Sequence, residues 1–342
     1  MMLKEFGYGL KFMDFCAGIG GGRLGLTENG LTAVACSEID KDAADTYKVF
    51  YGKDERNYGD LMKIDTSTLP DFDLMIGGFP CQTFSMVGKR AGFEDERGQV
   101  IFGLMKILKE KNVKYFILEN VKGFVSHDNG NSLKTVLSEF DKLGYDVSWK
   151  VLNSINFGVP QSRERIYLVG IRKDIPHNPI DWGTPITATT TLKDCLRGLH
   201  GEPVSIYSKS WQDYLNTPKN KGKFDVEELL KQDYLVIDRR NTDMRIYKGK
   251  TPTLRNGNHG LYYVYRKQLY KVNGYQGLML QGFPKEYITK AKRAKLNPNK
   301  LLAQAGNAMT VNVVSYVCKV LLQSLATTQN TCDVSSNDKL CA

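Results

Sequence analysis

The sequence lacks any pattern of cysteines or histidines that is typical of a zinc site or a disulfide framework. Its seven cysteines include no CxxC pair, and its four histidines lie far apart. The cysteines are scattered over positions 16, 36, 81, 195, 318, 332 and 341. We therefore expect no bound metal and a reducing compartment, in which a single cysteine can act as a thiolate.

We also expect neither a membrane-spanning apolar run nor a secretory leader. The first residues, MMLKEFGYGLKF, carry charges and no apolar segment of the kind found in signal peptides. We expect that no apolar run approaches the length that crosses a bilayer. We expect a soluble cytoplasmic protein without a membrane partner.

Acidic residues are scarce where basic residues cluster. The formal net charge is +10, and nine Lys or Arg face two Asp between Asp238 and Lys271. Lys290 to Lys300 adds five basic residues and no acidic one. A solvated surface would need no such clustering, so the pattern favours a nucleic-acid partner.

The N-terminal half alternates short apolar segments with amphipathic ones. Such an alternation predicts an α/β fold with a mostly parallel sheet covered on both faces. The predicted strands are Leu10–Phe15, Ala33–Cys36, Leu74–Ile76, Tyr115–Leu118, Asp146–Leu152 and Arg165–Ile171. The predicted helices are a segment from the glycine run to Leu31, Ile101–Lys111, Ser132–Leu143 and Val311–Leu325. Ligands of such sheets bind beyond the carboxyl ends of the strands.

The alternation stops after about Asp174, and a loop-rich region with strand fragments follows. We predict a catalytic and cofactor-binding domain over 1–176 and a small β-rich domain over 177–280. Residues 281–328 are predicted to be a hinge and a C-terminal helix that rejoins the first domain. The polar tail, 329–342, is predicted to be disordered.

DFCAGIGGG (Asp14–Gly22) follows a predicted strand and opens a predicted helix, where backbone N–H groups are free to bind a ligand. Its glycines fit the GxGxxG pattern, but a tight turn without a ligand is nearly as common. Glu38, at the end of the next strand, can accept both hydroxyls of a ribose. Asp60 can accept an adenine amino group. Together they favour a nucleoside cofactor, although each carboxylate alone could cap a helix or lie in solvent.

Three further segments place reactive groups at predicted strand ends. Cys81 lies in GFPCQTFS, Glu119 in ENV, and Arg163 and Arg165 in QSRER, where period-two geometry puts both arginines on one side. A thiolate that adds to carbon 6 of cytosine turns carbon 5 into a nucleophile for an electrophilic methyl group. Glu119 can hold N3 and the exocyclic amine, and Arg165 can bind O2.

These motifs, in this order, resemble the bacterial cytosine-C5 DNA methyltransferases from Phe12 to about Tyr316. DFCAGIGGG is similar to the first motif of that family, SEID and GDL to the cofactor motifs, and GFPCQTFS to the catalytic loop. ENV, QSRER and QAGNAMTVNVV resemble the remaining motifs. The resemblance implies a Rossmann-like catalytic domain, a target-recognition domain, S-adenosyl-L-methionine as cofactor and a cytosine that is flipped out of double-stranded DNA.

The resemblance also implies roles for single residues. Cys81 would be the nucleophile in a turn shaped by Pro80, Asn120 would fix that turn, and Arg163 would brace the catalytic loop or hold a phosphate. The implied cofactor-binding residues are Asp14, Cys16, Gly18, Gly20, Gly21, Glu38, Ile39, Asp60, Leu61 and Asn307. Cys16 replaces the usual aromatic residue and Ile39 a bulkier side chain, so the adenine would have less aromatic contact. Cys16 itself is expected to be a small buried residue rather than a second nucleophile.

Contacts with DNA are expected from the region between QSRER and the last motif. RIYKGKTPTL (Arg245–Leu254) resembles a strand that ends in the family's Thr-Leu pair, with Thr253 on a phosphate. The candidate DNA-binding residues are Arg239, Arg240, Arg245, Thr253, Arg255 and Asn256, together with Lys89 and Arg97 of the segment after Cys81. Arg245 is the preferred reader of a guanine.

Other interpretations share part of this pattern. An RNA-directed relative would keep the same catalytic residues, but its recognition region would be shorter. An inactive DNA-binding relative would lack Cys81 or Glu119, and a nicotinamide dehydrogenase would not need PCQ, ENV or QSRER. We expect a monomer associated with the bacterial nucleoid, and the resemblance leaves open a restriction endonuclease that acts on the same site without direct contact.

Overall fold

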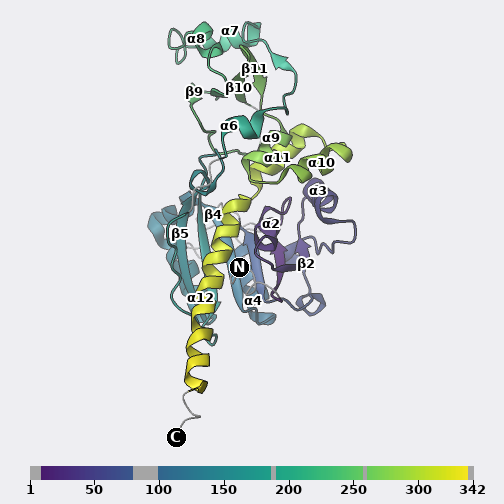
Figure 1. Cartoon of the computed structure of the whole chain (residues 1–342), viewed down its shortest axis with the longest axis vertical. Helices are drawn as coiled ribbons and strands as arrows, with labels where there is room; N and C mark the ends of the chain where they lie inside the picture. The colour runs from purple at the N-terminus through teal and green to yellow at the C-terminus, as the bar shows by residue number, and fades with distance from the viewer. Residues whose placement is uncertain (1–8, 80–98, 186–189, 257–259, 338–342) are drawn as a thin grey trace. The chain divides into compact units, whose positions relative to one another are not determined.

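The computed structural model describes residues 9–79, 99–185, 190–256 and 260–337, with side chains up to residue 326. The chain forms two compact units (Figure 1). The first consists of residues 1–153, 164–185 and 309–342, and the second of residues 154–163 and 186–308. The second unit therefore includes a short segment that ends at Arg163, the first arginine of QSRER, and a long segment that ends at residue 308. The sequence instead predicts a second domain over 177–280.

The first unit is built on a six-stranded sheet in the order β2-β1-β3-β4-β6-β5. The pairs β1–β2, β1–β3 and β3–β4 are parallel, whereas β4–β6 and β5–β6 are antiparallel. The strands are β1 (Lys11–Phe15), β2 (Thr32–Ser37), β3 (Leu74–Gly78), β4 (Tyr115–Val121), β5 (Tyr145–Asn153) and β6 (Glu164–Arg172). This mostly parallel α/β sheet is the predicted fold class.

Helices cover both faces of this sheet. On one face α4 (Gln99–Glu110) and α5 (Asn131–Lys142) contribute Leu104 and Phe140 to a core that includes Met75 and Phe116. Side chains alternate along a strand, so Ile76 points to the other face. There it lies against Gly22 of α2 (Gly21–Thr27).

The opposite layer depends on a close helix–helix contact. A Cβ atom on Gly25 of α2 would come within 2.6 Å of Val314 on α12 (Val311–Asn337), so only glycine allows this approach. Figure 1 shows α12 running along the first unit beside α2. The unit also contains α3 (Lys41–Tyr51) and the 3₁₀ turns η1 (Leu61–Lys63), η2 (Thr66–Thr68), η4 (Lys122–Val125) and η5 (His127–Gly130).

The second unit has an antiparallel five-stranded sheet in the order β7-β11-β10-β8-β9. Its strands are β7 (Pro203–Val204), β8 (Val236–Arg239), β9 (Met244–Tyr247), β10 (Leu261–Tyr265) and β11 (Gln268–Lys271). Adjacent residues of β8 face different cores, since Val236 packs with Tyr263 and Ile237 with Trp211. The helical elements are η6 (Ser154–Phe157), α6 (Leu192–Leu196), α7 (Lys209–Leu215), α8 (Val226–Leu230), α9 (Gly274–Leu280), α10 (Lys285–Arg293) and α11 (Pro298–Asn307).

Three predicted element ends differ most from the structure. The helix after the glycine run ends at Thr27 rather than Leu31, because Gly30 adopts a φ of 88°. The predicted strand through Leu254 ends at Tyr247, since Gly249 turns the chain with a φ of 69°. α12 continues to Asn337, where the sequence predicts a disordered tail.

One stretch of the described residues, Pro298–Ala326, is long and apolar enough to cross a membrane by length and composition. The expectation that no run reaches this length is therefore wrong. Its most apolar window is 72% buried inside the structure, as the core helices of soluble proteins also are. Within the described ranges, no group of three or more His, Cys, Asp or Glu side chains is placed to hold a metal.

Candidate active site

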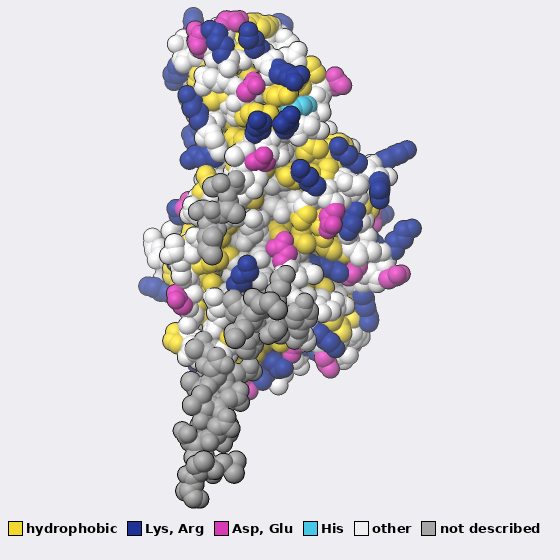
Figure 2. All heavy atoms as spheres, in the orientation of Figure 1, with side chains coloured by type: hydrophobic (Ala, Val, Ile, Leu, Met, Phe, Trp, Pro, Cys, Tyr) yellow, Lys and Arg dark blue, Asp and Glu magenta, His cyan; other side chains and the backbone are white. Residues whose placement is uncertain are grey.

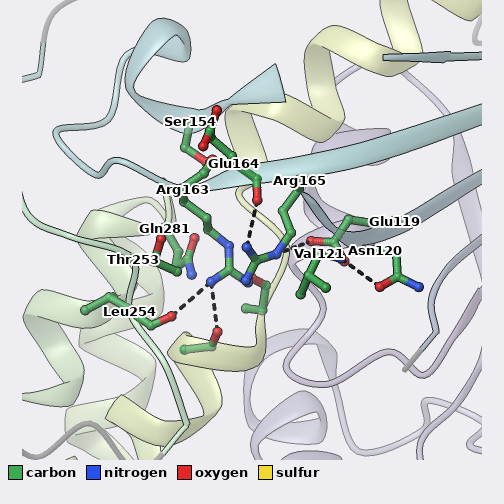
Figure 3. Close-up of polar contacts among 12 residues, drawn as sticks. Glu119, Asn120, Val121, Ser154, Arg163, Glu164, Arg165, Thr253, Leu254 and Gln281 are labelled. Carbon is green, nitrogen blue, oxygen red and sulfur yellow. Dashed lines mark hydrogen bonds and ion pairs between the residues drawn. The ribbon is translucent and has the colours of Figure 1, made fainter. Parts of the chain in front are cut away.

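A carboxylate and a guanidinium meet at the carboxyl end of the central strand β4. Arg165 Nε on β6 lies 3.1 Å from Glu119 Oε1, and both side chains are largely buried. Figure 3 shows the Arg165 side chain turned toward Glu119. The antiparallel pairing of Val121 with Arg165 brings the two strands into this register. Arg165 Nη1 also donates to the carbonyl of Glu164 at 2.8 Å, and the other three of its five N–H groups have no hydrogen-bond partner among the described residues.

The strand β3, which pairs with β4, precedes the predicted nucleophile in the sequence. Gly78 pairs with Glu119, and a Cβ atom on Gly78 would lie 3.7 Å from Glu119 Oε2. The N–H of Phe79 donates to the Glu119 carbonyl at 3.3 Å. Pro80 and Cys81 follow directly in the sequence. These two residues, and the predicted DNA contacts Lys89 and Arg97, lie outside the described residues.

Asn120 is buried beside Glu119, at 2% exposure. Its Oδ1 accepts the N–H of Val121 at 2.7 Å, as Figure 3 shows. Its Nδ2 has no hydrogen-bond partner among the described residues. A buried amide donor normally has an acceptor. The arrangement suits the predicted role of Asn120 as a support for the backbone after Phe79.

Arg163 belongs to the second unit and is 2% exposed. Its Nη1 donates to the carbonyls of Leu254 and Gly306 at 3.0 Å, and its Nη2 donates to that of Ala308 at 3.0 Å (Figure 3). The segments that Arg163 braces among the described residues are those that end at Leu254 and Ala308, and its predicted contact with the catalytic loop or a phosphate stays a prediction.

The glycine run forms a tight turn between β1 and α2. Gly18 has a φ of 56° with open space where a Cβ atom would be, and Gly20 caps α2 with a φ of 80°. A Cβ atom on Gly20 would lie 2.3 Å from the Tyr51 ring, and one on Gly21 would lie 2.4 Å from the Met309 carbonyl. Gly20 and Gly21 therefore serve close packing, whereas the open side of Gly18 is where a ligand can approach.

Glu38 follows β2 and connects two turns. Its Oε2 accepts the N–H of Gly18, and its Oε1 accepts the N–H of Asp40, both at 2.7 Å. Asn57 accepts the N–H of Glu38 at 2.9 Å and that of Gly59 at 2.9 Å, which ties Glu38 to the GDL segment. Each carboxylate oxygen has a second lone pair, so Glu38 can still accept a hydroxyl.

Asp60 caps the 3₁₀ turn η1, because its side chain accepts the N–H of Met62 at 3.0 Å. The sequence leaves a helix-cap role open for Asp60, and the structure has Asp60 in that role. The bond from Met62 uses only one of the two carboxylate oxygens. Leu61 is buried at 8% exposure, whereas Ile39 is 72% exposed. An apolar side chain this exposed next to Glu38 is suited to contact with a flat ligand.

Burial controls the charge of the remaining groups at this turn. Burial raises the pKa of the Asp14 carboxyl well above its usual range, and the N–H of Arg23, 3.2 Å away, offsets this only in part. Asp14 Oδ1 is buried with no hydrogen-bond partner among the described residues. Burial, reinforced by the charges of Glu38 and Asp14, raises the pKa of the Cys16 thiol to about 12. A neutral thiol supports the expectation that Cys16 is not a nucleophile.

The other predicted ligand residues lie in the second unit. Asn307 is exposed at the end of α11. The Thr253 hydroxyl donates its only proton to the Ser162 carbonyl at 2.8 Å, so a phosphate contact would require this bond to break. Arg239, Arg240, Arg255 and Asn256 line a cavity of about 710 Å³, whereas Arg245 does not. Arg245 pairs with Asp243 at 3.0 Å.

Comparisons with known proteins agree with this arrangement. The chain matches the C-5 cytosine-specific DNA methylase family over residues 10–323. It belongs to this family. It is 35% identical over 322 residues to the type II methyltransferase M1.ScrFI of Lactococcus lactis subsp. cremoris, covering 92% of this chain and 78% of that protein. It is 33% identical over 328 residues to M.HhaI of Haemophilus parahaemolyticus, covering 93% and 95%.

The fold of the methylase is likewise similar to that of solved methyltransferases. The crystal structure of the S. pombe Dnmt2 methyltransferase matches 92% of this chain and 99% of that one, with a TM-score of 0.63 and 19% identity. The predicted family, the enzyme class of DNA cytosine-C5 methyltransferase and the fold class are thus confirmed. The roles of single residues stay predictions.

Sequence reasoning missed several residues that support the methylase site. Gln161 accepts the N–H of Leu254 at 2.9 Å and donates to the Leu280 carbonyl at 2.8 Å, and it is fully buried. Asn57 links the two cofactor motifs, and the Tyr51 hydroxyl donates to the Gly20 carbonyl at 2.6 Å. Gln161 lies inside QSRER and could have been noticed there, but nothing in the sequence marks Asn57 or Tyr51.

Proposed function

We propose that this methylase transfers a methyl group from S-adenosyl-L-methionine to carbon 5 of a cytosine in a specific double-stranded DNA sequence. The observation that carries the proposal is the Glu119–Arg165 pair at the end of β4, 3.1 Å apart. Phe79 is the first residue of the FPC segment, and its N–H donates to the Glu119 carbonyl. A carboxylate of β4 and a guanidinium of β6 thus lie at the carboxyl end of β4, beside β3, the strand that precedes Cys81 in the sequence.

Cys81 is the nucleophile in this proposal. Its thiolate forms a bond to carbon 6 of the cytosine, and the electron pair of the 5,6 double bond then becomes available at carbon 5. Carbon 5 would take the methyl group as the bond between that group and the sulfonium sulfur of the cofactor breaks, which would leave a neutral thioether, and a base would then remove the carbon 5 proton. The electrons of that C–H bond restore the double bond, the S–C6 bond breaks and the thiolate leaves. The target base must be outside the helix for this chemistry, so the proposal includes base flipping.

Glu119 and Arg165 bind the ring in this scheme. Glu119 accepts a hydrogen bond from the exocyclic amine and shares a proton with N3, which makes carbon 6 more electrophilic. Arg165 donates to O2, where negative charge develops. Their mutual ion pair fixes both groups before the base arrives, and their low exposure strengthens each interaction with the substrate.

The residues at the glycine turn fit the proposed cofactor. S-adenosyl-L-methionine supplies an electrophilic methyl group when it is bound. Asp14 Oδ1, which has no hydrogen-bond partner among the described residues, and the open side of Gly18 suit its charged amino-acid part. Glu38 would bind the ribose hydroxyls, Asp60 the adenine amine and Ile39 the adenine ring. Asn307 as a further cofactor residue stays a prediction, as do the monomeric state and a restriction endonuclease that acts on the same site.

Trapping on a modified base tests the covalent step. DNA that carries 5-fluorocytosine at the target should form a denaturation-resistant adduct with the parent protein, because fluorine does not leave as a proton does. Cys81→Ser should form no adduct. The matched control is Cys195→Ala, which should trap as the parent does, because Cys195 is buried in the second unit, outside the unit that contains Glu119 and Arg165, and burial raises the pKa of its thiol to about 12. Trapping by Cys81→Ser at the parent level would remove Cys81 from the mechanism.

Bisulfite sequencing of host DNA after expression of the protein would identify the target sequence. A reproducible methylated motif is expected. Methylated RNA together with unmodified DNA would instead support an RNA substrate.

A further inference from the structure

The second unit contains a cavity of about 710 Å³ in which basic side chains surround one acidic one. Its lining includes Asp238, Arg239, Arg240, Arg255, Asn256 and Tyr214. A base reader in such a cavity needs a donor set that is both available and held in a fixed direction. The arginines differ in these two properties.

Arg239 is not available. Its Nη2 donates to the Ser210 carbonyl at 2.9 Å and to the Ser210 hydroxyl at 3.0 Å. Its guanidinium carbon lies 4.8 Å from the ring centroids of both Trp211 and Tyr214. These contacts fasten the end of β8 to α7. Arg239 is therefore a structural cation, and substituting it would disturb the sheet rather than a single base contact.

Arg245 is available but lies elsewhere. It is exposed on β9, does not line the cavity, and pairs with Asp243, two residues before it. Arg240 does line the cavity, but none of the described residues forms a side-chain hydrogen bond or ion pair with it that would fix its direction. Arg245 thus lies outside the cavity, and Arg240 lies in it without a contact that fixes its direction, so neither is suited to read a base.

Arg255 has both properties. Its side chain is 54% exposed, and its Nη2 lies 4.0 Å from Oδ2 of Asp238, whose own side chain is only 3% exposed. An ion pair at this distance favours orientations of the guanidinium toward this wall of the cavity. The distance is that of an ion pair rather than a short hydrogen bond, which leaves the N–H groups free for a ligand.

The backbone that carries Arg255 is held just as firmly. Gln161 accepts the N–H of Leu254 at 2.9 Å, and Arg163 donates to the Leu254 carbonyl at 3.0 Å. A Cβ atom on Gly306 would lie 2.6 Å from the carbonyl carbon of Arg255, so glycine there lets the α11 end press against this segment. These interactions with buried residues fix the root of the Arg255 side chain.

We propose that Arg255, oriented by Asp238, reads a guanine of the target sequence through paired hydrogen bonds to O6 and N7. Asp238 is a positioning residue that does not touch the DNA. Arginine makes this bidentate contact in the major groove, where guanine alone presents two adjacent acceptors. The inference rests on the proposed function and adds to it one reader, one base and the residue that orients the reader.

The test measures methylation by parent and variants on a panel of DNA duplexes that differ by one base pair from the target. Arg255→Gln should lose discrimination at a single guanine position by roughly 5- to 150-fold, with other positions ranked as in the parent. Arg255→Lys keeps the charge but loses the planar fork, so it should lose discrimination at the same position. Arg245→Gln is the matched control and should leave the ranking of all sites unchanged.

Asp238→Asn separates positioning from a general structural role. Discrimination should fall at the position affected by Arg255→Gln and at no other. The double variant Asp238→Asn/Arg255→Gln should be no less selective than Arg255→Gln alone, because the two residues act through one contact. If Asp238→Asn lowers methylation of every duplex by the same factor, its positioning role is refuted.

Two outcomes distinguish the inference from the function on which it rests. A parent that methylates a defined DNA motif, with an Arg255→Gln variant that keeps the ranking of sites, overturns only the assignment of Arg255. A parent that methylates no DNA overturns the proposed function and the inference with it.

Discussion

The two units of this methylase differ sharply in charge. The second unit contains 23 Lys and Arg residues and 10 Asp and Glu residues, a formal charge of +13. The first unit contains 24 basic and 27 acidic residues, a formal charge of −3. The excess basicity of the chain therefore belongs entirely to the second unit, and Figure 2 shows Lys and Arg side chains spread over its visible face.

This difference corresponds to a difference in how polar groups are used. In the first unit the proposed functional groups are carboxylates at strand ends, such as Glu38 and Glu119, each held by a specific partner. In the second unit they are cations on loops and short helices. Chemistry on a base needs a few groups with fixed positions, whereas attraction of a DNA backbone depends on summed charge. The comparison predicts that the two properties can be damaged separately.

The largest expected effect is on the chemical step. Glu119→Gln keeps the size of the side chain but removes the charge that pairs with Arg165, so N3 of the cytosine loses its proton partner. We expect kcat for methyl transfer to fall by about 10²- to 10⁴-fold. DNA affinity and its dependence on salt should stay close to those of the parent, as gel-shift titrations at several salt concentrations would measure.

The matched control is Glu139→Gln, on α5 of the same unit. Glu139 is also ion-paired, with Lys142 at 2.7 Å, but it is half-buried within a helix rather than placed at the carboxyl end of a strand. Its kcat should be that of the parent. A Glu119→Gln enzyme with near-parent kcat would show that the carboxylate at the end of β4 is structural.

A smaller effect is expected on the cofactor. Removal of one charge-assisted hydrogen bond should weaken S-adenosyl-L-methionine binding by about 1.5–3 kcal/mol, measured by calorimetry on Glu38→Gln and Asp60→Asn. Asn caps helices as well as Asp does, so Asp60→Asn should keep η1 intact. DNA affinity should not change in either variant, because both residues lie in the acidic unit.

Asp65→Asn provides the control for Asp60→Asn. Asp65 caps η2 as Asp60 caps η1, through a bond from Ser67 N–H at 3.0 Å, the same distance as the Met62 bond to Asp60. Cofactor affinity should be unchanged in Asp65→Asn. If all three variants bind the cofactor as the parent does, Asp60 and Glu38 are caps and turn supports only.

The sequence pattern predicted the fold of the first unit well, and its proposed functional residues lie at the ends of predicted strands. Glu119 follows an apolar run, and the end of a strand in a parallel sheet is where ligand groups collect. The pairing of Glu119 with Arg165 was not itself visible, since it depends on the antiparallel register of β4 and β6. The positions of both residues at strand ends were nonetheless predictable, because ENV and QSRER each border an apolar run.

The second unit was less predictable because its key contacts join distant segments. Arg163 donates to carbonyls that lie 91 to 145 positions further along the chain, and any residue type supplies a carbonyl. Asp238 and Arg255 meet only after β8 and the segment beyond Leu254 have been packed together. The preference for Arg245 relied on a strand through Leu254, and the turn at Gly249 ends that strand early.

The smallest expected effect concerns the basic surface of the second unit. Lys292 and Arg293, exposed in the last turn of α10, belong to the run of five basic residues without an acidic one. If they bind DNA phosphates, replacing both with Gln releases fewer counterions on binding, and the log–log salt slope should shrink by about 1 for each phosphate that is no longer neutralised. Gln is a good helix former, so α10 should keep its structure. Neither kcat at saturating DNA nor cofactor affinity should change.

Replacing Lys41 and Lys48, two exposed cations of α3 in the first unit, removes the same charge from the chain. An equal reduction of the slope by both double variants would mean that net charge alone drives DNA binding, and the contrast between the two units would then have no role in it.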